Sequence, residues 1–282
     1  MYCYGRRTII YPTQNAHSRF FFYFILFIMA TAERVTAHEI SDNVIYQRHL
    51  VAYNEAARHL KGRVLEVGCG DGYGIPLLAP FADEYYAIDK FAPDPQRFSP
   101  AIDNLRMMQM SVPPIGFADN MFDYIVSFQV IEHIEDDKAL VREMARVLRP
   151  GGKLILTTPN RTMSLTRNPW HVREYLPDEL TALLQTHFSS VTMNGVYGND
   201  KVMAYYEQNK QSVARFTRYD IFNLQYKLPR VLLQIPYDLL NRVNRRLLLK
   251  GNQQLVSDVA HTDYHISPAT ATCFDLLAIA TK

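Results

Sequence analysis

A glycine-rich turn is the strongest chemical signal in this sequence of 282 residues. Residues 64–74 are VLEVGCGDGYG, a short apolar run followed by a glycine at every second position. Glycine is needed where the backbone takes a left-handed conformation or must approach a ligand closely. In open α/β sheets, ligands bind at the carboxyl ends of the strands, where such a turn would lie. The motif therefore predicts a ligand-binding turn, with a purely structural tight turn as the alternative.

The spacing of the glycines distinguishes two classes of nucleotide site. A dinucleotide fingerprint requires GxGxxG, but Tyr73 occupies the third glycine position and the glycines instead follow GxGxGxG. With an acidic residue inside the preceding strand, the run resembles the E/DxGxGxG motif of class I S-adenosylmethionine-dependent methyltransferases. The resemblance implies that the turn holds the methionine part of S-adenosylmethionine. It assigns cofactor contacts to Glu66, Gly68, Cys69, Gly70, Asp71 and Gly72.

Other segments resemble the same family in the same order. Asp89 ends the second predicted strand, where a carboxylate can accept hydrogen bonds from both ribose hydroxyls; a strand-end turn aspartate is the alternative. The segments IGFADNMFD (115–123), QVIEH (129–133) and RVLRPGGK (146–153) resemble the family's sequences around the fourth strand and before the fifth. The resemblance covers residues 61–160 and the final strand.

One position departs from the family pattern. Many relatives carry an aspartate after the third strand that contacts the adenine amino group, and the matching residue here is Ser111. The adenine contact is therefore assigned to Ser111 or to the backbone near Met110. Gln129, directly after the fourth predicted strand, completes the set of expected cofactor contacts.

Candidate residues for the acceptor side follow the fourth and fifth predicted strands. Residues 168–175, NPWHVREY, contain the only tryptophan of the chain together with His, Arg and Tyr, side chains that can stack on and hydrogen-bond an acceptor. We name His133, His171 and Tyr175 as candidate catalytic residues, since a hydroxyl acceptor benefits from a general base. The alternatives are an ordered loop whose aromatics fill a gap, and a helix-capping or packing role for His133.

The elements that position these motifs alternate along the chain. Apolar runs predict strands, helical spacing predicts helices, and the resulting order implies a mostly parallel sheet with helices on both faces. We expect a doubly wound, seven-stranded Rossmann-like α/β methyltransferase fold with a helical insertion before the last strand. The strands are expected at 64–67, 85–88, 105–110, 122–128, 153–158, 191–197 and 273–280, and the helices at 41–60, 73–82, 137–148 and 177–186.

Composition divides the chain into segments of different character. Residues 1–29 are expected to be a disordered or non-native extension before a start at Met29, although their apolar run also imitates a signal peptide. A helical segment follows at 30–60 and the methyltransferase core at 61–197. Residues 198–270 are expected to form a basic helical insertion, a cap over the site, and 271–282 the last core strand.

Charge and cysteine usage limit the partners. A net charge of +2 gives no indication of nucleic-acid binding. The three cysteines lie far apart without CxxC spacing, which argues against a disulfide scaffold or a zinc site and fits a cytoplasmic protein. We predict no metal site, because Asp136 and Asp137 open a helix as capping residues.

The predicted function is methyl transfer from S-adenosylmethionine to a small molecule, with O-methylation of a sugar or polysaccharide precursor as the first hypothesis. A lipid-linked acceptor is also considered, because residues 228–249 form an amphipathic segment with Arg on its polar side that could touch a membrane surface weakly. An ordinary cap with a solvated basic face is the alternative there. Two other classes remain open: a non-catalytic methyltransferase-like binding protein and a nicotinamide-dependent Rossmann oxidoreductase.

Overall fold

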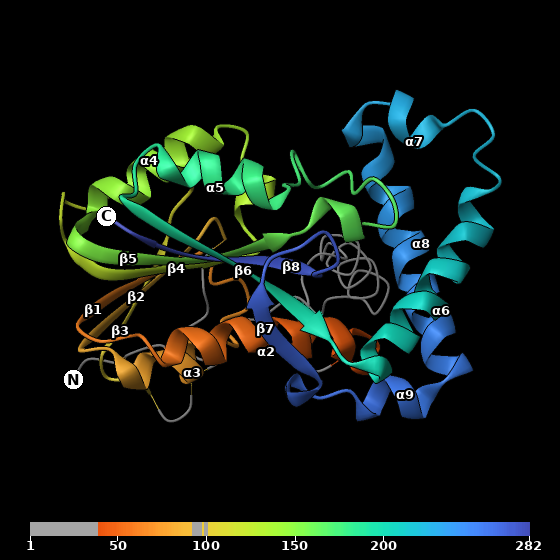
Figure 1. Cartoon of the computed structure of the whole chain (residues 1–282), viewed down its shortest axis with the longest axis horizontal. Coiled ribbons are helices and arrows are strands. Elements are labelled where there is room, and N and C mark those ends of the chain that lie inside the picture. The colour runs from red at the N-terminus through yellow and green to blue at the C-terminus, as the bar shows by residue number, and fades with distance from the viewer. Residues whose placement is uncertain (1–38, 92–97, 99–100) are drawn as a thin grey trace, which may run out of the picture.

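One mixed sheet forms the centre of the molecule in the computed structural model, which describes residues 39–91, 98 and 101–282. The expectations for residues 1–29 lie outside the described residues. The strand order is β3-β2-β1-β4-β5-β8-β6-β7 (Figure 1). The strands are β1 (Arg63–Val67), β2 (Glu84–Asp89), β3 (Leu105–Gln109), β4 (Phe122–Phe128), β5 (Leu148–Pro159), β6 (Ser190–Gly198), β7 (Tyr264–Pro268) and β8 (Asp275–Thr281).

The first five strands are parallel neighbours, so their carboxyl ends meet at one edge of the sheet. Val64 of β1 pairs with Tyr85 of β2 on one side and with Tyr124 of β4 on the other. β8 runs antiparallel to both β5 and β6. The mostly parallel Rossmann-like sheet expected from the sequence is confirmed.

The sheet has eight strands, and the expected seven is therefore corrected. The added strand, β7, is the edge strand at this end of the sheet and pairs antiparallel with β6. It lies inside the range 198–270 that was expected to form a basic helical insertion. Its sequence, YHISP, alternates apolar and polar residues, which suits an edge strand with one face on the core.

Helices cover both faces of the sheet (Figure 1). On one face lie α4 (Asp137–Val147) and α5 (Pro177–Gln185), and on the other lie α2 (Asn43–Ala57) and α3 (Ile75–Leu78). The helix expected at 73–82 is shorter in the structure and continues as a 3₁₀ turn over Ala79–Phe81. Pro80 explains the difference, because proline has no backbone N–H for the next helical hydrogen bond.

The two faces of the sheet bury separate hydrophobic clusters, because successive strand residues point to opposite sides. Val64 packs on the α2 side, whereas Leu65 packs on the α4 side. Helix α4 is capped by the Asp136 side chain, which accepts a hydrogen bond from the Ala139 N–H, as its capping role predicts. Burial on both faces explains why the central strands are near-continuous apolar runs.

A helical lobe stands at one end of the sheet (Figure 1). It consists of α6 (Asp200–Thr217), α7 (Leu224–Lys227), α8 (Arg230–Gly251) and α9 (Gln253–Asp258). No helix among the described residues is long and apolar enough to cross a membrane.

Helix α2 connects this lobe to the core. Arg245 of α8 pairs with Asp42 at 2.7 Å, and the Asn43 side chain donates to the carbonyl oxygens of Val256 and Val259 at 2.8 and 2.9 Å. Further along the same helix, Tyr53 is buried against the sheet. One helix therefore touches both the lobe and the strands.

Candidate active site

The glycine turn follows β1 directly and is held against β2. Gly68, Gly70 and Gly72 all have left-handed φ angles, of 82°, 54° and 77°. The Gly68 N–H donates to the Ile88 carbonyl at 2.8 Å. A Cβ on Gly68 would lie 2.4 Å from the Val130 side chain, whereas a Cβ on Gly70 would meet nothing within 4 Å. Gly70 therefore presents its backbone to open space, as a ligand-facing residue must.

Asp89 lies beside the turn at the end of β2. Its Oδ2 accepts a hydrogen bond from the Gly70 N–H at 2.9 Å, and its Oδ1 accepts from the Phe91 N–H at 2.9 Å. The side chain is half-buried. The carboxylate is therefore fixed beside the glycines, and carboxylate oxygens are acceptors of the kind that a ribose diol needs.

The adenine-side candidates lie next to Asp89. The Met110 N–H donates to the Asp89 carbonyl at 2.8 Å, and the Met110 Sδ accepts from the Gly116 N–H at 3.3 Å. Ser111 is exposed. Within the turn, Cys69 is buried and Asp71 is half-buried. All of these residues lie at the carboxyl edge of the parallel strands, and their contacts with a cofactor stay predictions.

Glu66 lies beneath the turn in the core. Its two carboxylate oxygens accept hydrogen bonds from the hydroxyls of Tyr53 and Tyr85, both at 2.9 Å. Burial raises the pKa of Glu66 to about 7, although the two tyrosine hydrogen bonds act in the opposite direction. The hydrogen bonds of Glu66 to Tyr53 and Tyr85 therefore stabilise the core beneath the glycine turn.

We expect the free energy of unfolding of the wild type to fall as the pH rises through about 7. In Glu66→Gln this fall should be absent. The pKa of Glu66 is higher in the folded protein than in the unfolded chain, so folding favours the protonated form. Its contribution is complete below the unfolded pKa and is lost as the pH rises through about 7. The loss is on the order of 3 kcal/mol. Denaturant unfolding at several pH values measures it, with Glu84→Gln as a surface control. Parallel pH slopes in wild type and variant would contradict the assignment.

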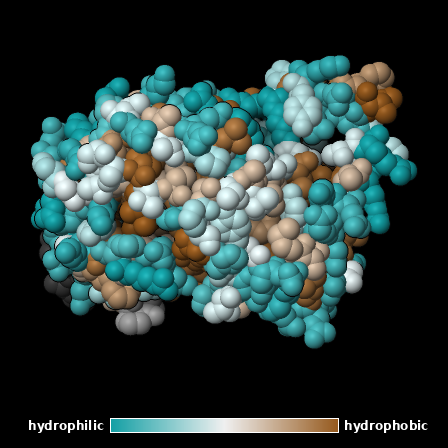
Figure 2. Space-filling model, in the orientation of Figure 1, coloured by the Kyte–Doolittle hydropathy of each residue, from teal (hydrophilic) through white to brown (hydrophobic). Residues whose placement is uncertain are grey.

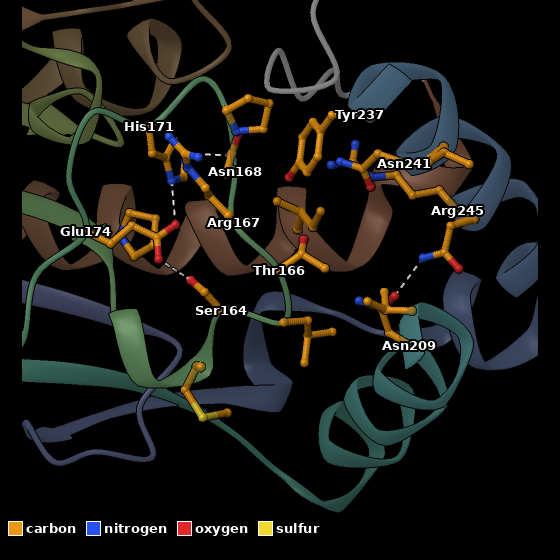
Figure 3. Close-up of a pocket in the computed structure, with 18 of the residues that line it drawn as sticks. Ser164, Thr166, Arg167, Asn168, His171, Glu174, Asn209, Tyr237, Asn241 and Arg245 are labelled. Carbon is orange, nitrogen blue, oxygen red and sulfur yellow. Dashed lines mark hydrogen bonds and ion pairs between the residues drawn. The ribbon is translucent and has the colours of Figure 1, made fainter. Parts of the chain in front are cut away.

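A cavity of about 700 Å³ lies against helix α2, which also contacts the turn; residues 68–74 and Asp89 are not part of its lining. It is lined by α2, by the segment after β4, by the loop after β5 and by helices α6 and α8 (Figure 3). His49 of its lining lies 3.0 Å from the Tyr73 hydroxyl in the turn region. Gln129, a predicted cofactor contact, also lines the cavity, with its N–H bonded to the Thr157 carbonyl. The volume is typical of a small-molecule site.

His133 lines this cavity with one ring nitrogen fixed. Its Nδ1 lies 3.1 Å from the carbonyl oxygen of Trp170. A carbonyl only accepts hydrogen bonds, so Nδ1 carries the proton and Nε2 has a free lone pair. No hydrogen bond joins Nε2 to another of the described residues. When the ring is neutral, it is thus oriented with Nε2 as the proton acceptor.

His171 lies beside His133 with both ring nitrogens engaged. The two ring centroids are 5.0 Å apart. His171 Nδ1 lies 2.7 Å from Glu174 Oε1, and its Nε2 lies 2.8 Å from Asn168 Nδ2 (Figure 3). The geometry fits a side chain that positions its neighbour better than one that takes a proton from an acceptor.

The predicted loop 168–175 divides between the cavity and the core. Tyr175, a candidate catalytic residue, is 1% exposed and does not line the cavity. Its hydroxyl donates to Asp137 Oδ2 at 2.8 Å, and Arg173 pairs with the same carboxylate; burial raises the pKa of Tyr175. Tyr175 therefore lies in the core and not, as expected, on the acceptor side.

Trp170 of the same loop contacts the helical lobe. Its Nε1 donates a hydrogen bond to Asp238 of α8 at 2.9 Å, which ties the loop to the lobe.

Three further cavity residues complete the site: Glu174, which lies in the predicted acceptor-side segment, and Glu132 and Arg48, which were not among the candidates. Glu132 is buried, and its Oε2 accepts from the Thr158 hydroxyl at 2.9 Å. Glu174 orients His171, as described above. Arg48 of α2 pairs with Asp275 at 2.9 Å. The motif QVIEH contains Glu132 and the segment NPWHVREY contains Glu174, whereas no sequence signal marks Arg48.

The residues Glu132, His133 and His171 form a group that could hold a metal ion, with ligand atoms within 4.8 Å of one another. The sequence prediction of no metal did not consider this group, since its members are brought together only by the fold. Catalytic zinc sites use three protein ligands. Both nitrogens of His171 already have protein partners, which leaves two residues with a ready ligand atom.

We therefore expect turnover to be independent of added metal. Dialysis against a chelator should leave the rate of the methyl transfer expected from the sequence unchanged, because a base of the kind that His133 offers acts through the lone pair of its imidazole. The rate is measured before chelation, after it and after addition of magnesium or zinc ions. A rate that falls on chelation and returns with one of these ions would assign the three residues to a metal site.

Comparisons with known proteins add the family. A family model described as "Methyltransferase domain" matches residues 38–198, more than half of the chain. The chain is 39% identical over 174 residues to a Mycobacterium tuberculosis protein named "Probable S-adenosylmethionine-dependent methyltransferase", an alignment covering 59% of this chain and 64% of that protein. It is 31% identical over 156 residues to a Xanthomonas oryzae "Ubiquinone biosynthesis O-methyltransferase", covering 47% and 65%. The chain thus spans just under two thirds of the length of these relatives.

The fold is also found among solved structures. A SAM-dependent methyltransferase from Thermotoga maritima superposes with a TM-score of 0.51 at 12% identity, covering 94% of this chain and 96% of that one. This likeness shows the fold. Together with the turn after β1 and the family match across it, it leads to one assignment: the chain belongs to the class I S-adenosylmethionine-dependent methyltransferase family.

Proposed function

We propose that this protein transfers a methyl group from S-adenosylmethionine to a hydroxyl group of a small molecule. The observation that carries the proposal is His133, which lines the cavity with Nδ1 bonded to a carbonyl and Nε2 available. A general base is useful when the nucleophile is a hydroxyl, because the proton must leave as the bond to carbon forms.

The cofactor would lie along the turn at the carboxyl edge of the strands. Gly68, Gly70 and Gly72 allow close approach of the backbone, and the Asp89 carboxylate would accept from the ribose hydroxyls. Met110 and Ser111 would border the adenine. Glu66 would act from below by holding the turn through its tyrosine contacts.

S-adenosylmethionine supplies an electrophilic methyl group on a sulfonium centre. The protein's task is to hold the acceptor oxygen in line with that methyl group and to exclude water. The acceptor oxygen forms the new bond to carbon as the bond from carbon to sulfur breaks, and His133 Nε2 takes the hydroxyl proton. His171, held by Glu174 and Asn168, would keep the His133 ring in place.

The lining of the cavity supports an acceptor with several hydroxyl groups. Asn209, Asn241 and Thr166, whose side chains donate and accept hydrogen bonds, line it together with Arg167, whose guanidinium donates (Figure 3). A sugar or polysaccharide precursor fits this set. The relative from Xanthomonas oryzae carries O-methyltransferase in its name, which agrees with transfer to oxygen.

A screen with methyl-labelled S-adenosylmethionine tests the proposal. Purified protein is offered sugars, hydroxylated aromatics, amines and thiols, and label transfer is measured with cofactor affinity in parallel. Transfer to hydroxyl acceptors is expected. Cofactor binding without transfer to any of them would favour the non-catalytic methyltransferase-like alternative, and transfer confined to amines or thiols would overturn the choice of oxygen.

A further inference from the structure

Apolar side chains crowd the outer surface of the helical lobe. Of the sixteen large hydrophobic residues that are exposed among the described residues, thirteen lie between 216 and 247. They are Phe216, Tyr219, Ile221, Phe222, Leu224, Tyr226, Val231, Leu232, Ile235, Leu239, Leu240, Val243 and Leu247. Figure 2 shows part of this surface as brown atoms over the α7 corner. Such a gathering of exposed apolar residues marks an interaction surface.

The apolar residues of α8 follow the helix period. Val231, Ile235, Leu239, Val243 and Leu247 recur every four residues, so they follow a stripe that winds gradually around the helix, through roughly 160° from the first to the last, and stays within one half of its circumference. Each is between 40% and 74% exposed. The opposite side of α8 faces the molecule, where Asn244 and Leu248 are buried. We call the exposed side of α8, together with the exposed apolar residues at 219–226, the outer face.

The charge of the lobe indicates which kind of partner binds the outer face. Residues 201–250 contain ten Lys or Arg and three Asp or Glu, a charge of +7. Because the whole chain carries +2, all other residues together carry −5. Arg246 and Lys250 are exposed near the end of α8. A second copy of the lobe would bring two such positive surfaces together, whereas anionic lipid headgroups attract them.

The cavity and the outer face share residues. Phe216, Tyr219, Leu224 and Leu240 line the cavity and are also exposed, so they form an apolar rim where the cavity reaches the surface. His133 lines the same cavity beside His171, which lies across the cavity from Tyr237 and Asn241 of α8 (Figure 3). A molecule that fills the cavity would place a polar group at His133 and an apolar part at the rim.

We infer that the outer face docks on an anionic membrane surface and that an acceptor with an apolar chain enters the cavity through the rim. The lobe lies on the membrane in the manner of an interfacial amphipathic helix, with apolar side chains below the headgroups and basic side chains among them. The role of the bound molecule as methyl acceptor rests on the proposed function; the docking does not.

Vesicle cosedimentation tests the docking with the full chain. We expect binding to phosphatidylglycerol vesicles at low salt, weaker binding at high salt and little binding to phosphatidylcholine vesicles. The double variant Ile235→Glu with Leu239→Glu, and the double variant Arg246→Glu with Lys250→Glu, should each lower the partition coefficient at least about tenfold. Phe81→Glu and Arg142→Glu are matched controls on exposed positions outside the lobe and should bind as the wild type does.

Two results would overturn the docking. One is wild-type protein that does not bind phosphatidylglycerol vesicles, or binds both lipids equally. The other is a dimer in light scattering that the Ile235→Glu and Leu239→Glu variant converts to a monomer, since the outer face would then join two copies. S-adenosylmethionine titration of each variant shows that it is folded. Vesicle binding without methylation of any hydroxyl would reject the proposed function and leave the docking intact.

Uptake through the rim has a separate readout. Trp170 is the only tryptophan of the chain, so its energy transfer to a dansyl-labelled fatty alcohol reports binding near the loop after β5. We expect saturable transfer in the wild type and at least about tenfold weaker binding in Leu224→Glu with Leu240→Glu, because two charges would stand in an apolar rim. Equal transfer in the wild type and this variant would overturn the rim as the route.

Discussion

Replacing His133 by glutamine is expected to lower the rate of methyl transfer by about 10²–10⁴-fold, the usual contribution of a general base. Glutamine can still donate a hydrogen bond to the Trp170 carbonyl that now holds Nδ1, but its amide has no basic lone pair for the acceptor proton. Affinity for S-adenosylmethionine should change little, because the cofactor contacts are assigned to the turn and to Asp89. Single-turnover rates with labelled cosubstrate and titration calorimetry measure the two quantities.

His171→Gln is the matched control for this prediction. Its nitrogens are held by Glu174 and Asn168, so we expect a smaller fall in rate than for His133→Gln. A positioning role also predicts that the pH dependence of the rate is kept in His171→Gln and lost in His133→Gln. If His171→Gln instead abolishes that pH dependence and His133→Gln retains it, the roles of the two histidines must be exchanged.

Asp89→Ala should weaken S-adenosylmethionine binding by roughly 10- to 150-fold, since a charged hydrogen-bonding partner contributes about 1.5–3 kcal/mol. The carboxylate lies beside Gly70 and can accept from both ribose hydroxyls. Asp89→Asn keeps one acceptor oxygen and should show an intermediate loss. Calorimetric titration of the three proteins gives the order.

Asp103→Ala provides the control for loss of a carboxylate from an exposed loop site. Because Asp89 also accepts from the Gly70 and Phe91 N–H groups, thermal unfolding of each variant must accompany the titration. An Asp89→Ala protein that is folded and binds the cofactor with wild-type affinity would remove the ribose role of this residue.

Much of the fold could be predicted because its signals are local. The central strands are apolar runs bounded by turns, and β4 spans Phe122–Phe128 as the sequence predicts. The helix after the glycine turn is shorter than expected, since Pro80 stops it. The strand β7 was missed because it is five residues long and its pairing partner, β6, lies far away in the sequence.

The glycine turn could be predicted from the sequence, whereas the cavity could not. The glycine turn is contiguous in sequence, so its motif and its geometry coincide. The cavity brings together α2, the segment after β4, the loop after β5 and the helical lobe, and contacts such as Trp170 with Asp238 depend on the tertiary fold. Within the loop, His171 faces the cavity while Tyr175 faces the core, a division that residue types alone did not reveal.

Helix α2 gives the two binding events a common mechanical element. At its start it is bonded to the lobe through Asp42 and Asn43, and further along, His49 and Tyr53 contact Tyr73 and Glu66 at the turn. A shift of this helix would change contacts both at the lobe and at the glycine turn. Occupancy of the cofactor site should therefore alter the affinity of the cavity for the acceptor. Thermodynamic linkage requires the effect to be reciprocal. The bound cofactor changes the affinity for the acceptor by the same factor by which the bound acceptor changes the affinity for the cofactor.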